Sequence, residues 1–236
     1  MSDALFYCPN IRENPQLSEQ ESHHCIKVLR MREGDRLTIT DGRGYFYDCI
    51  LTEAHPKHCV VGIEKEIFRG KSWNFYLHIA FAPTKNMERN EWFVEKATEI
   101  GIDEITPILC RFSERKEIKS ERLRKIMVSA MKQSWQAVLP SLSEMISFQE
   151  LISMPFAGRK FIAHCYSSME KKPLTQIYRK GEEALLLIGP EGDFSEEEVQ
   201  EAMKKGFEPI SLGENRLRTE TACLAACHTV HVLNQL

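Results

Sequence analysis

Two polar segments carry the residue types that could bind a ligand and take part in chemistry. Residues 211–222 hold two arginines, two glutamates and two threonines between an apolar strand-like run and an apolar C-terminal stretch. Residues 186–195 contain Gly-Pro-Glu-Gly directly after an apolar run. Glycine permits positive φ or close backbone approach, and proline fixes φ. Together the two segments predict a cradle for a ligand.

Common nucleotide motifs are missing from both segments. Neither contains Gly-x-x-x-x-Gly-Lys-Ser/Thr, and no Gly-x-Gly-x-x-Gly opens a helix after a strand. We therefore do not expect a phosphate-binding loop or a dinucleotide site, and we expect a ligand held by backbone groups.

The last apolar stretch contains a possible metal-binding set, whose members are Cys223, Cys227, His228 and His231. Their spacing lets several share one helix face. A structural zinc commonly takes its four ligands from two separate segments, and this helix must also pack on a sheet. We expect buried cysteines and core histidines here, and no metal.

The charge distribution leaves room for a nucleic-acid partner despite a net charge of −3. Residues 111–132 contain eight basic and three acidic side chains, whereas residues 191–201 contain six acidic and no basic ones. Both runs fit solvated helix faces. The basic run is also a candidate track for phosphates.

Length and composition indicate a globular protein of one large or two modest domains. The chain has 236 residues, of which 42% are hydrophobic and 28% charged. No apolar run approaches the roughly 20 residues of a membrane span, and the first residues lack the features of a secretion signal. Eight scattered cysteines in a chain of this size fit reduced thiols. We expect a soluble, cytoplasmic protein.

The first seventy residues predict a small β-barrel-like domain. Residues 36–51 alternate apolar and polar types on both sides of Asp41-Gly42-Arg43-Gly44, which is typical of a hairpin. A short helix is expected at 22–29 and another strand at 58–68. The polar, glycine-containing residues 69–72 mark the boundary.

The rest of the chain alternates strands and helices. We expect strands at 74–82, 102–110, 160–166, 184–188 and 207–212, and helices at 86–100, 120–137, 195–206 and 219–236. Ser195 and Glu198 form a capping-box pattern, and Gly101 and Gly206 follow helices. This alternation predicts an α/β fold with a mostly parallel sheet covered on both faces. Both polar segments then lie at carboxyl ends of strands, where such sheets bind ligands.

Four motifs at this spacing resemble the RsmE family of 16S ribosomal RNA (uracil-N3) methyltransferases, which belong to the SPOUT class. They are Ile188-Gly-Pro-Glu-Gly192, Leu217-Arg-Thr-Glu-Thr-Ala222, the segment from Met87 to Gly101 and the segment His24-Cys-Ile-Lys-Val-Leu-Arg-Met31. The resemblance extends over nearly the whole chain. Members of the family methylate N3 of one uridine in the decoding region of the small-subunit RNA.

The resemblance implies a PUA-like RNA-binding barrel at residues 1–70 and a SPOUT methyltransferase domain, tied in a deep trefoil knot, at 71–236. It implies S-adenosylmethionine (SAM) as cofactor, 16S RNA in the small ribosomal subunit as partner, and a homodimer with the site near its interface. By matching position, the cofactor loops comprise Ile188, Gly189, Pro190, Glu191, Gly192, Leu212, Gly213, Leu217, Arg218, Thr219, Thr221 and Ala222.

Loss of the N3 proton leaves negative charge on the uracil. A cation near the uracil oxygens would stabilise this charge, and a carboxylate could accept the proton. Arg218 is the candidate cation, and its alternative role is to hold the loop by bonding carbonyls or Glu220. Glu220 is a candidate base, although an acidic residue there also favours the helix dipole. Thr219 and Thr221 are expected to cap the last helix and shape the loop. Glu191 is expected to organise its loop, or else to accept a proton.

Candidate RNA contacts in the small domain are Lys27, Arg30, Arg32 and Arg43, each of which could instead be solvated surface. Three departures from the family pattern bear on RNA contacts. Asn215 stands where an arginine is usual, with Arg216 one residue later. Residues 133–136 are Gln-Ser-Trp-Gln instead of basic, and Asp3-Ala4-Leu5 replaces an N-terminal arginine region. Another SPOUT activity, such as ribose 2′-O methylation, and a non-catalytic RNA-binding protein remain alternatives.

Overall fold

The computed structural model describes residues 4–236, whose contacts divide the chain into two units. One unit holds the described residues up to Ser72 together with Val128–Leu139, and the other holds Trp73–Met127 and Pro140–Leu236. The boundary predicted after residue 70 assigned Val128–Leu139 to the second domain, whereas in the structure this segment packs with the first unit.

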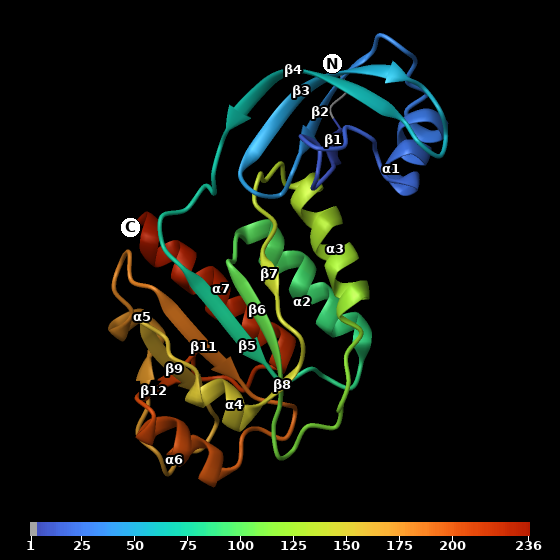
Figure 1. Ribbon diagram of the computed structural model, residues 1–236. Coiled ribbons are helices and arrows are strands. Elements are labelled where there is room, and N and C mark those ends of the chain that lie inside the picture. Colours follow the sequence, from blue (N-terminus) through green and yellow to red (C-terminus); the bar gives the residue numbers. More distant parts are fainter. Residues whose placement is uncertain (1–3) are drawn as a thin grey trace. The chain divides into compact units, whose positions relative to one another are not determined.

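The first unit is built on a four-stranded sheet (Figure 1). Its strands are β1 (Leu5–Tyr7), β2 (Arg36–Thr40), β3 (Tyr45–Glu53) and β4 (Val60–Phe68), in the order β1-β2-β3-β4. The predicted hairpin is present, because β2 and β3 pair antiparallel. Its turn is held by the Asp41 carboxylate, which accepts the N–H groups of Arg43 and Tyr45 at 2.8 and 3.2 Å.

The helix expected at 22–29 begins earlier and changes type. It consists of α1 (Glu19–His23), capped by the Ser18 hydroxyl, followed by a π-helical turn, η1 (His24–Val28). Cys25 of this turn is fully buried in the core of the unit.

Hydrogen bonds join the segment Val128–Leu139 to the hairpin of the first unit. The Ala137 carbonyl accepts bonds from the Gly44 N–H at 2.8 Å and from the Thr40 hydroxyl at 3.3 Å. The Trp135 ring meets Phe46 edge to face at 6.2 Å, and Trp135 has a φ of 53°. These contacts explain why the helix expected to reach residue 137 stops at Gln133.

The second unit contains the predicted α/β sheet, and all of its strand pairs are parallel. Seven strands follow the order β10-β12-β9-β11-β5-β6-β7, and β8 also pairs with β6. The strands are β5 (Leu77–Phe81), β6 (Glu104–Leu109), β7 (Ser141–Leu142), β8 (Ile146–Ser147), β9 (Arg159–Ala163), β10 (Lys172–Pro173), β11 (Ala184–Ile188) and β12 (Phe207–Ser211).

Helices cover both faces of this sheet (Figure 1). The helices of this unit are α2 (Met87–Ile100), α4 (Phe148–Ser153), α5 (Leu174–Ile177), α6 (Glu196–Lys204) and α7 (Thr219–Gln235). The remaining long helix, α3 (Ser120–Gln133), begins in the second unit, and its residues from Val128 onward belong to the first. The capping box predicted at Ser195 and Glu198 is present at the start of α6.

A separate apolar layer lies on each face of the sheet. On one face, Phe148 of α4 and Val199 of α6 share a buried cluster with Leu185 and Leu187 of β11. On the other, α7 packs beside α2 and on β5 and β11. Alternate strand residues point to opposite faces, so a fully buried strand such as β11 reads as a continuous apolar run.

Three of the four possible metal ligands of α7 are buried in this packing, namely Cys223, Cys227 and His231. His228 is exposed, so the expectation of a core histidine is wrong at that position. The His231 Nε2 hydrogen-bonds the Gly101 carbonyl at 2.6 Å, and the Cys227 thiol donates to the same carbonyl at 3.6 Å. Gly101 has a φ of 120°, and a Cβ there would lie 2.8 Å from the Trp73 ring. Within residues 4–236, no group of three or more His, Cys, Asp or Glu could hold a metal.

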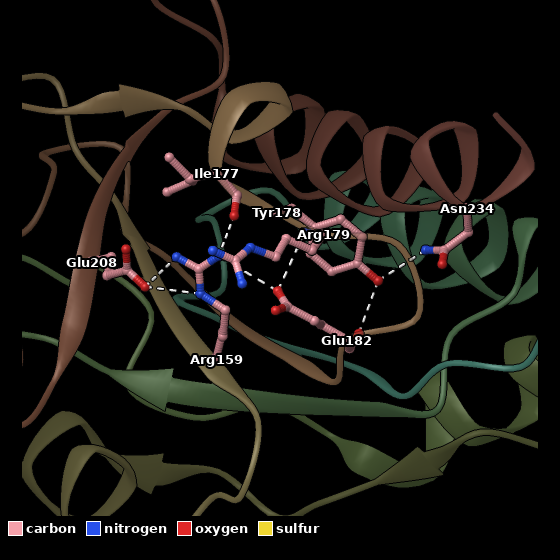
Figure 2. Close-up of polar contacts among 7 residues, drawn as sticks. All are labelled: Arg159, Ile177, Tyr178, Arg179, Glu182, Glu208 and Asn234. Atoms are coloured by element: carbon pink, nitrogen blue, oxygen red, sulfur yellow. Dashed lines mark hydrogen bonds and ion pairs between the residues drawn. The ribbon is translucent and has the colours of Figure 1, made fainter.

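A polar network fastens the amino ends of β9 and β12 to α5 and α7 (Figure 2). The Arg159 guanidinium donates to Glu208 Oε1 through Nε at 3.0 Å and also to the Ile177 carbonyl. Asn234 donates to the Tyr178 hydroxyl at 2.9 Å, and that hydroxyl donates to the Glu182 carbonyl at 2.8 Å. This network leaves the opposite edge of the sheet to the candidate site.

The parallel α/β sheet and the preceding small β domain confirm the predicted fold class. Strand order and pairing do not record how the chain threads through its own loops. The deep trefoil knot therefore stays a prediction.

Candidate functional site

A cavity of about 590 Å³ lies at the carboxyl ends of three adjacent strands, β11, β9 and β12. The loops after these strands and the first turn of α7 form its wall. Its lining residues are Arg89, Ala163, His164, Cys165, Lys171, Ile188, Gly189, Pro190, Glu191, Asp193, Ile210, Ser211, Leu212, Gly213, Glu214, Asn215, Arg216, Leu217, Arg218, Thr219 and Ala222.

Both polar segments singled out in the sequence meet in this cavity. All of the predicted cofactor-binding residues line it except Gly192 and Thr221. Gly192 lies beside Phe112 instead, where an added Cβ would come within 3.2 Å of the Phe112 Cβ. Thr221 is exposed in the first turn of α7.

The loop after β11 is shaped by close packing more than by glycine dihedrals. Gly189 and Gly192 both lack a positive φ, but a Cβ on Gly189 would lie 3.0 Å from the Phe194 ring. The positive φ falls on Asp193, at 68°. Its carboxylate accepts the N–H groups of Phe194 and Cys165, both at 2.8 Å, which holds this uncommon conformation.

Glu191 ties the loop after β11 to the loop after β5. Its Oε1 accepts the backbone N–H of Lys85 at 3.0 Å. The Lys85 carbonyl in turn accepts from the Arg115 guanidinium at 2.5 Å. These bonds agree with the expectation that Glu191 organises its loop.

Thr219 joins two walls of the cavity. Its buried hydroxyl donates to the Gly189 carbonyl at 3.0 Å, so it shapes the loop as expected. The prediction that Thr219 caps α7 is wrong, because Arg218 occupies the N-cap position and α7 has no side-chain cap. Thr219 is the first residue inside α7, one position after the N-cap.

Arg218 and Glu220 lie in different environments. Arg218 is exposed at the cavity, and its side chain makes no hydrogen bond or ion pair within residues 4–236. Glu220 is 8% exposed and does not line the cavity. Its Oε1 lies 3.6 Å from the Nε of Arg89, and its buried Oε2 has no hydrogen-bond partner among the described residues. Glu220 thus supports Arg89, which does face the cavity.

Two family models match the chain, and together they cover most of both structural units. A model described as an RNA methyltransferase domain matches residues 71–231. A model described as an RNA methyltransferase PUA domain matches residues 17–64.

Similar proteins agree with these matches. The ribosomal RNA small subunit methyltransferase E of Buchnera aphidicola is 30% identical over 217 residues, covering 89% of this chain and 84% of the relative. The chain belongs to the ribosomal RNA small subunit methyltransferase E family.

Two solved structures are similar along almost the full length of this chain. A probable rRNA-methyltransferase from Porphyromonas gingivalis is 45% identical with a TM-score of 0.94, covering 98% of each chain. A ribosomal RNA small subunit methyltransferase E from Neisseria gonorrhoeae, crystallised with SAM, is 26% identical with a TM-score of 0.86, covering 98% of this chain and 97% of that one.

Several cavity residues of this methyltransferase E family member were missed by sequence reasoning. The strand expected to run to Tyr166 ends at Ala163, so His164 and Cys165 belong to the loop and line the cavity. The Asp193 carboxylate accepts a hydrogen bond from the Cys165 N–H, so this N–H is not available for pairing with a neighbouring strand. Arg89 lay within a quoted family motif but was not predicted as a site residue.

The three departures from the methyltransferase E pattern lie in different parts of the structure. Asn215 and Arg216 both line the cavity, so the positive charge in this part of the wall lies one residue later than in the usual pattern. Trp135 packs on Phe46 of the first unit. Of the N-terminal departure, Asp3 lies outside the described residues, and Leu5 is buried in β1.

The candidate RNA contacts of the first unit are all exposed, but they do not form one cluster. Lys27, Arg30 and Arg32 follow one another at η1 and before β2. Arg43 lies at the other end of β2, in the hairpin turn, and bridges to Val138. Five residues of strand separate these ends, which is about 17 Å at ~3.4 Å per residue.

Much of the basic run 111–132 is engaged within the protein. Arg111 pairs with Glu197 at 3.0 Å and Arg122 with Glu91 at 2.5 Å. The side chains that also have protein partners are those of Arg115, Arg124 and Lys132. This pairing leaves Lys116, Lys119 and Lys125 as the more available part of the candidate phosphate track.

None of the helices in the described part of the chain combines the length and apolarity needed to cross a membrane.

Proposed function

We propose that this protein transfers a methyl group from SAM to N3 of a single uridine in the decoding region of 16S ribosomal RNA, at the position usually numbered 1498. Its substrate would be RNA of the small ribosomal subunit. The observation that carries the proposal is the cavity at the ends of β9, β11 and β12, which unites the two family motifs.

The cavity fits a ligand of the size of SAM. A volume of about 590 Å³ lies within the range of roughly 300–1,000 Å³ found for small-molecule sites. Gly189, which lines the cavity, packs closely on Phe194, where even a Cβ would be crowded, and this contact fixes the position of the loop after β11. The wall also offers buried apolar groups, Ile188 and Ile210, beside charged side chains. This mixture suits a cofactor with a flat aromatic base and a charged amino-acid end.

When bound, SAM supplies an electrophilic methyl group on a sulfonium. The nucleophile would be N3 of uracil, which would release its proton to solvent water as the new N–C bond forms, while the electron pair of the broken C–S bond stays on sulfur and S-adenosylhomocysteine leaves. Negative charge then spreads to the neighbouring uracil oxygens, and a preorganised cation lowers the energy of that state. Arg218 is our candidate for this role, because its guanidinium is exposed at the cavity and is not engaged by described residues.

Arg89 provides a second cation on the same wall, and Glu220 positions it. Because Glu220 is buried behind Arg89, we do not assign it the role of base. Glu191, tied to the Lys85 N–H, organises the loop that faces them. The residues of the wall would bind the methyl donor and the nucleophile together, and alignment of the two would supply a large part of the acceleration.

The assembly and location follow the same family reasoning. We propose a homodimer whose loops form the SPOUT knot, acting in the cytoplasm. Exposed apolar side chains on α2 and α7, those of Trp92 and Val232, support a further contact surface on the methyltransferase unit. The PUA-like unit, with its exposed Lys27, Arg30 and Arg32, would bind RNA through phosphates.

Label transfer tests the proposed reaction. Small subunits and naked 16S RNA from a strain lacking the modification are incubated with the protein and methyl-labelled SAM, and the nucleosides are separated by mass spectrometry. We expect label in 3-methyluridine. Label in a ribose would indicate a different SPOUT activity, and no label on either substrate, with SAM bound, would indicate a non-catalytic RNA-binding protein.

A further inference from the structure

His164 lines the cavity at the end of the central one of its three strands. It directly follows Ala163, the last residue of β9, and β9 lies between β11 and β12 in the sheet. The loops after β11 and β12 form the walls on either side. A ligand that spans these two walls must therefore pass over the loop that begins with His164.

The imidazole of His164 is buried without any hydrogen-bond partner. The residue is 6% exposed, and neither Nδ1 nor Nε2 bonds a described residue. The other two buried histidines are both satisfied: His78 bonds the Thr106 hydroxyl at 2.8 Å, and His231 bonds the Gly101 carbonyl at 2.6 Å. Buried polar groups in folded proteins almost always have a partner, so the two free nitrogens of His164 require one.

The surroundings of His164 keep its ring neutral. Burial, and then the nearby Lys171 ammonium, lower the pKa of His164, while Asp193 acts in the opposite direction. Lys171 is itself fixed, because its Nζ donates to the carbonyls of His164 and Tyr166, both at 3.1 Å. A neutral imidazole offers one N–H donor and one acceptor nitrogen.

We propose that His164 recognises the adenosine part of bound SAM through a hydrogen bond from its neutral imidazole, an inference that rests on the proposed function. The charged amino-acid end of SAM forms stronger hydrogen bonds with charged groups than with a neutral imidazole. The cavity provides such charged groups in Arg89, Arg216, Arg218 and Glu191. Ribose hydroxyls and the adenine edge are neutral groups that both donate and accept. They match the single donor and single acceptor of a neutral imidazole.

Calorimetric titration of His164→Phe tests the contact. Phenylalanine keeps a flat ring and removes both unpaired nitrogens, so we expect the variant to be at least as resistant to urea as the wild type. Its affinity should fall about fivefold to tenfold, the effect of one neutral hydrogen bond, for both S-adenosylhomocysteine and 5′-methylthioadenosine. The second ligand carries the adenosine part without the amino-acid end.

His78→Phe is the matched control. It removes a buried imidazole that already bonds Thr106, near the amino ends of β5 and β6, away from the cavity. We expect this variant to lose stability and to keep wild-type affinity for both ligands. If His164→Phe does not fold, His164→Ala is titrated in its place.

The outcomes separate this inference from the proposed function. Unchanged affinity of the His164 variants for both ligands overturns the inference and leaves the function standing. Weaker binding of S-adenosylhomocysteine alone also overturns it, because the contact would then be to the amino-acid end. A wild-type protein that binds neither SAM nor these two ligands would contradict the proposed function itself.

Discussion

The hydrogen bond between Thr219 and Gly189 predicts a measurable link between the stability of the cavity and its affinity for SAM. The Thr219 hydroxyl is buried and donates to the Gly189 carbonyl at 3.0 Å. Replacing Thr219 by Val preserves the shape of the side chain and removes the donor. The Gly189 carbonyl is then left buried without its partner, because no other described group bonds it.

The expected cost follows from the loss of that partner. Leaving a buried carbonyl unsatisfied costs about 1–3 kcal/mol. Taking about 2 kcal/mol, the melting temperature should fall by roughly 4–8 °C for a chain of this size. Because the bond joins the loop after β11 to the start of α7, its loss also loosens two walls of the cavity. If SAM binding must reorder these loosened walls at a cost of about 1.4 kcal/mol, the affinity for SAM drops about tenfold.

Urea unfolding and calorimetric titration with SAM measure the two effects on the same samples. Thr219→Ser is the matched control, since it keeps the hydroxyl and loses only a methyl group, worth about 0.8 kcal/mol. We expect Thr219→Ser to retain near wild-type affinity. The reasoning is refuted if Thr219→Val is as stable as Thr219→Ser and binds SAM as tightly as the wild type.

Three further predictions concern catalysis, packing and pH. Arg218→Ala should slow methyl transfer about 100-fold, as for loss of one transition-state donor; a wild-type rate for this variant in single-turnover assays would remove Arg218 from the mechanism. Arg159→Met should cost about 2 kcal/mol in urea unfolding without changing SAM affinity, because it removes charge-assisted bonds at the far edge of the sheet. Burial lowers the pKa of His78, His164 and His231 below the usual 6.5. As the pH falls, these imidazoles therefore bind protons in the unfolded chain before they do so in the folded protein. The free energy of unfolding should therefore decline as the pH falls from about 7.5 to 5.5, by up to about 1.4 kcal/mol per pH unit for each imidazole; a level profile over this range would contradict this.

The two loop motifs were sufficient to locate the cavity, because glycine and proline restrict the backbone locally and a strand end restricts where a loop can lie. His164 could not be found in this way. Its segment continues the apolar alternation of a strand, and β9 ends at Ala163 only because Asp193, far along the chain, takes the Cys165 N–H. Arg89 lies in a correctly predicted helix, but the face that α2 turns to the cavity depends on its packing against α7.

The larger elements were predictable from periodicity and capping residues, as Asn86, Gly101 and Ser195 show for α2 and α6. Short elements such as β7, β8 and β10 have two residues each and carry no periodic signal. The end of α3 was missed for a different reason. The bonds of Ala137 to Thr40 and Gly44 draw this segment into the first unit, and only tertiary contacts reveal that.

Primer extension across the decoding region of 16S RNA tests the central claim most directly. A methyl group on N3 lies on the Watson–Crick edge of uracil and blocks base pairing, so reverse transcriptase must stop one nucleotide before the modified uridine. With small subunits, SAM and this protein, we expect a single new stop at that position, absent when SAM is omitted. Read-through at every uridine of the region, from a protein that binds SAM, would contradict the proposed uracil-N3 methyl transfer.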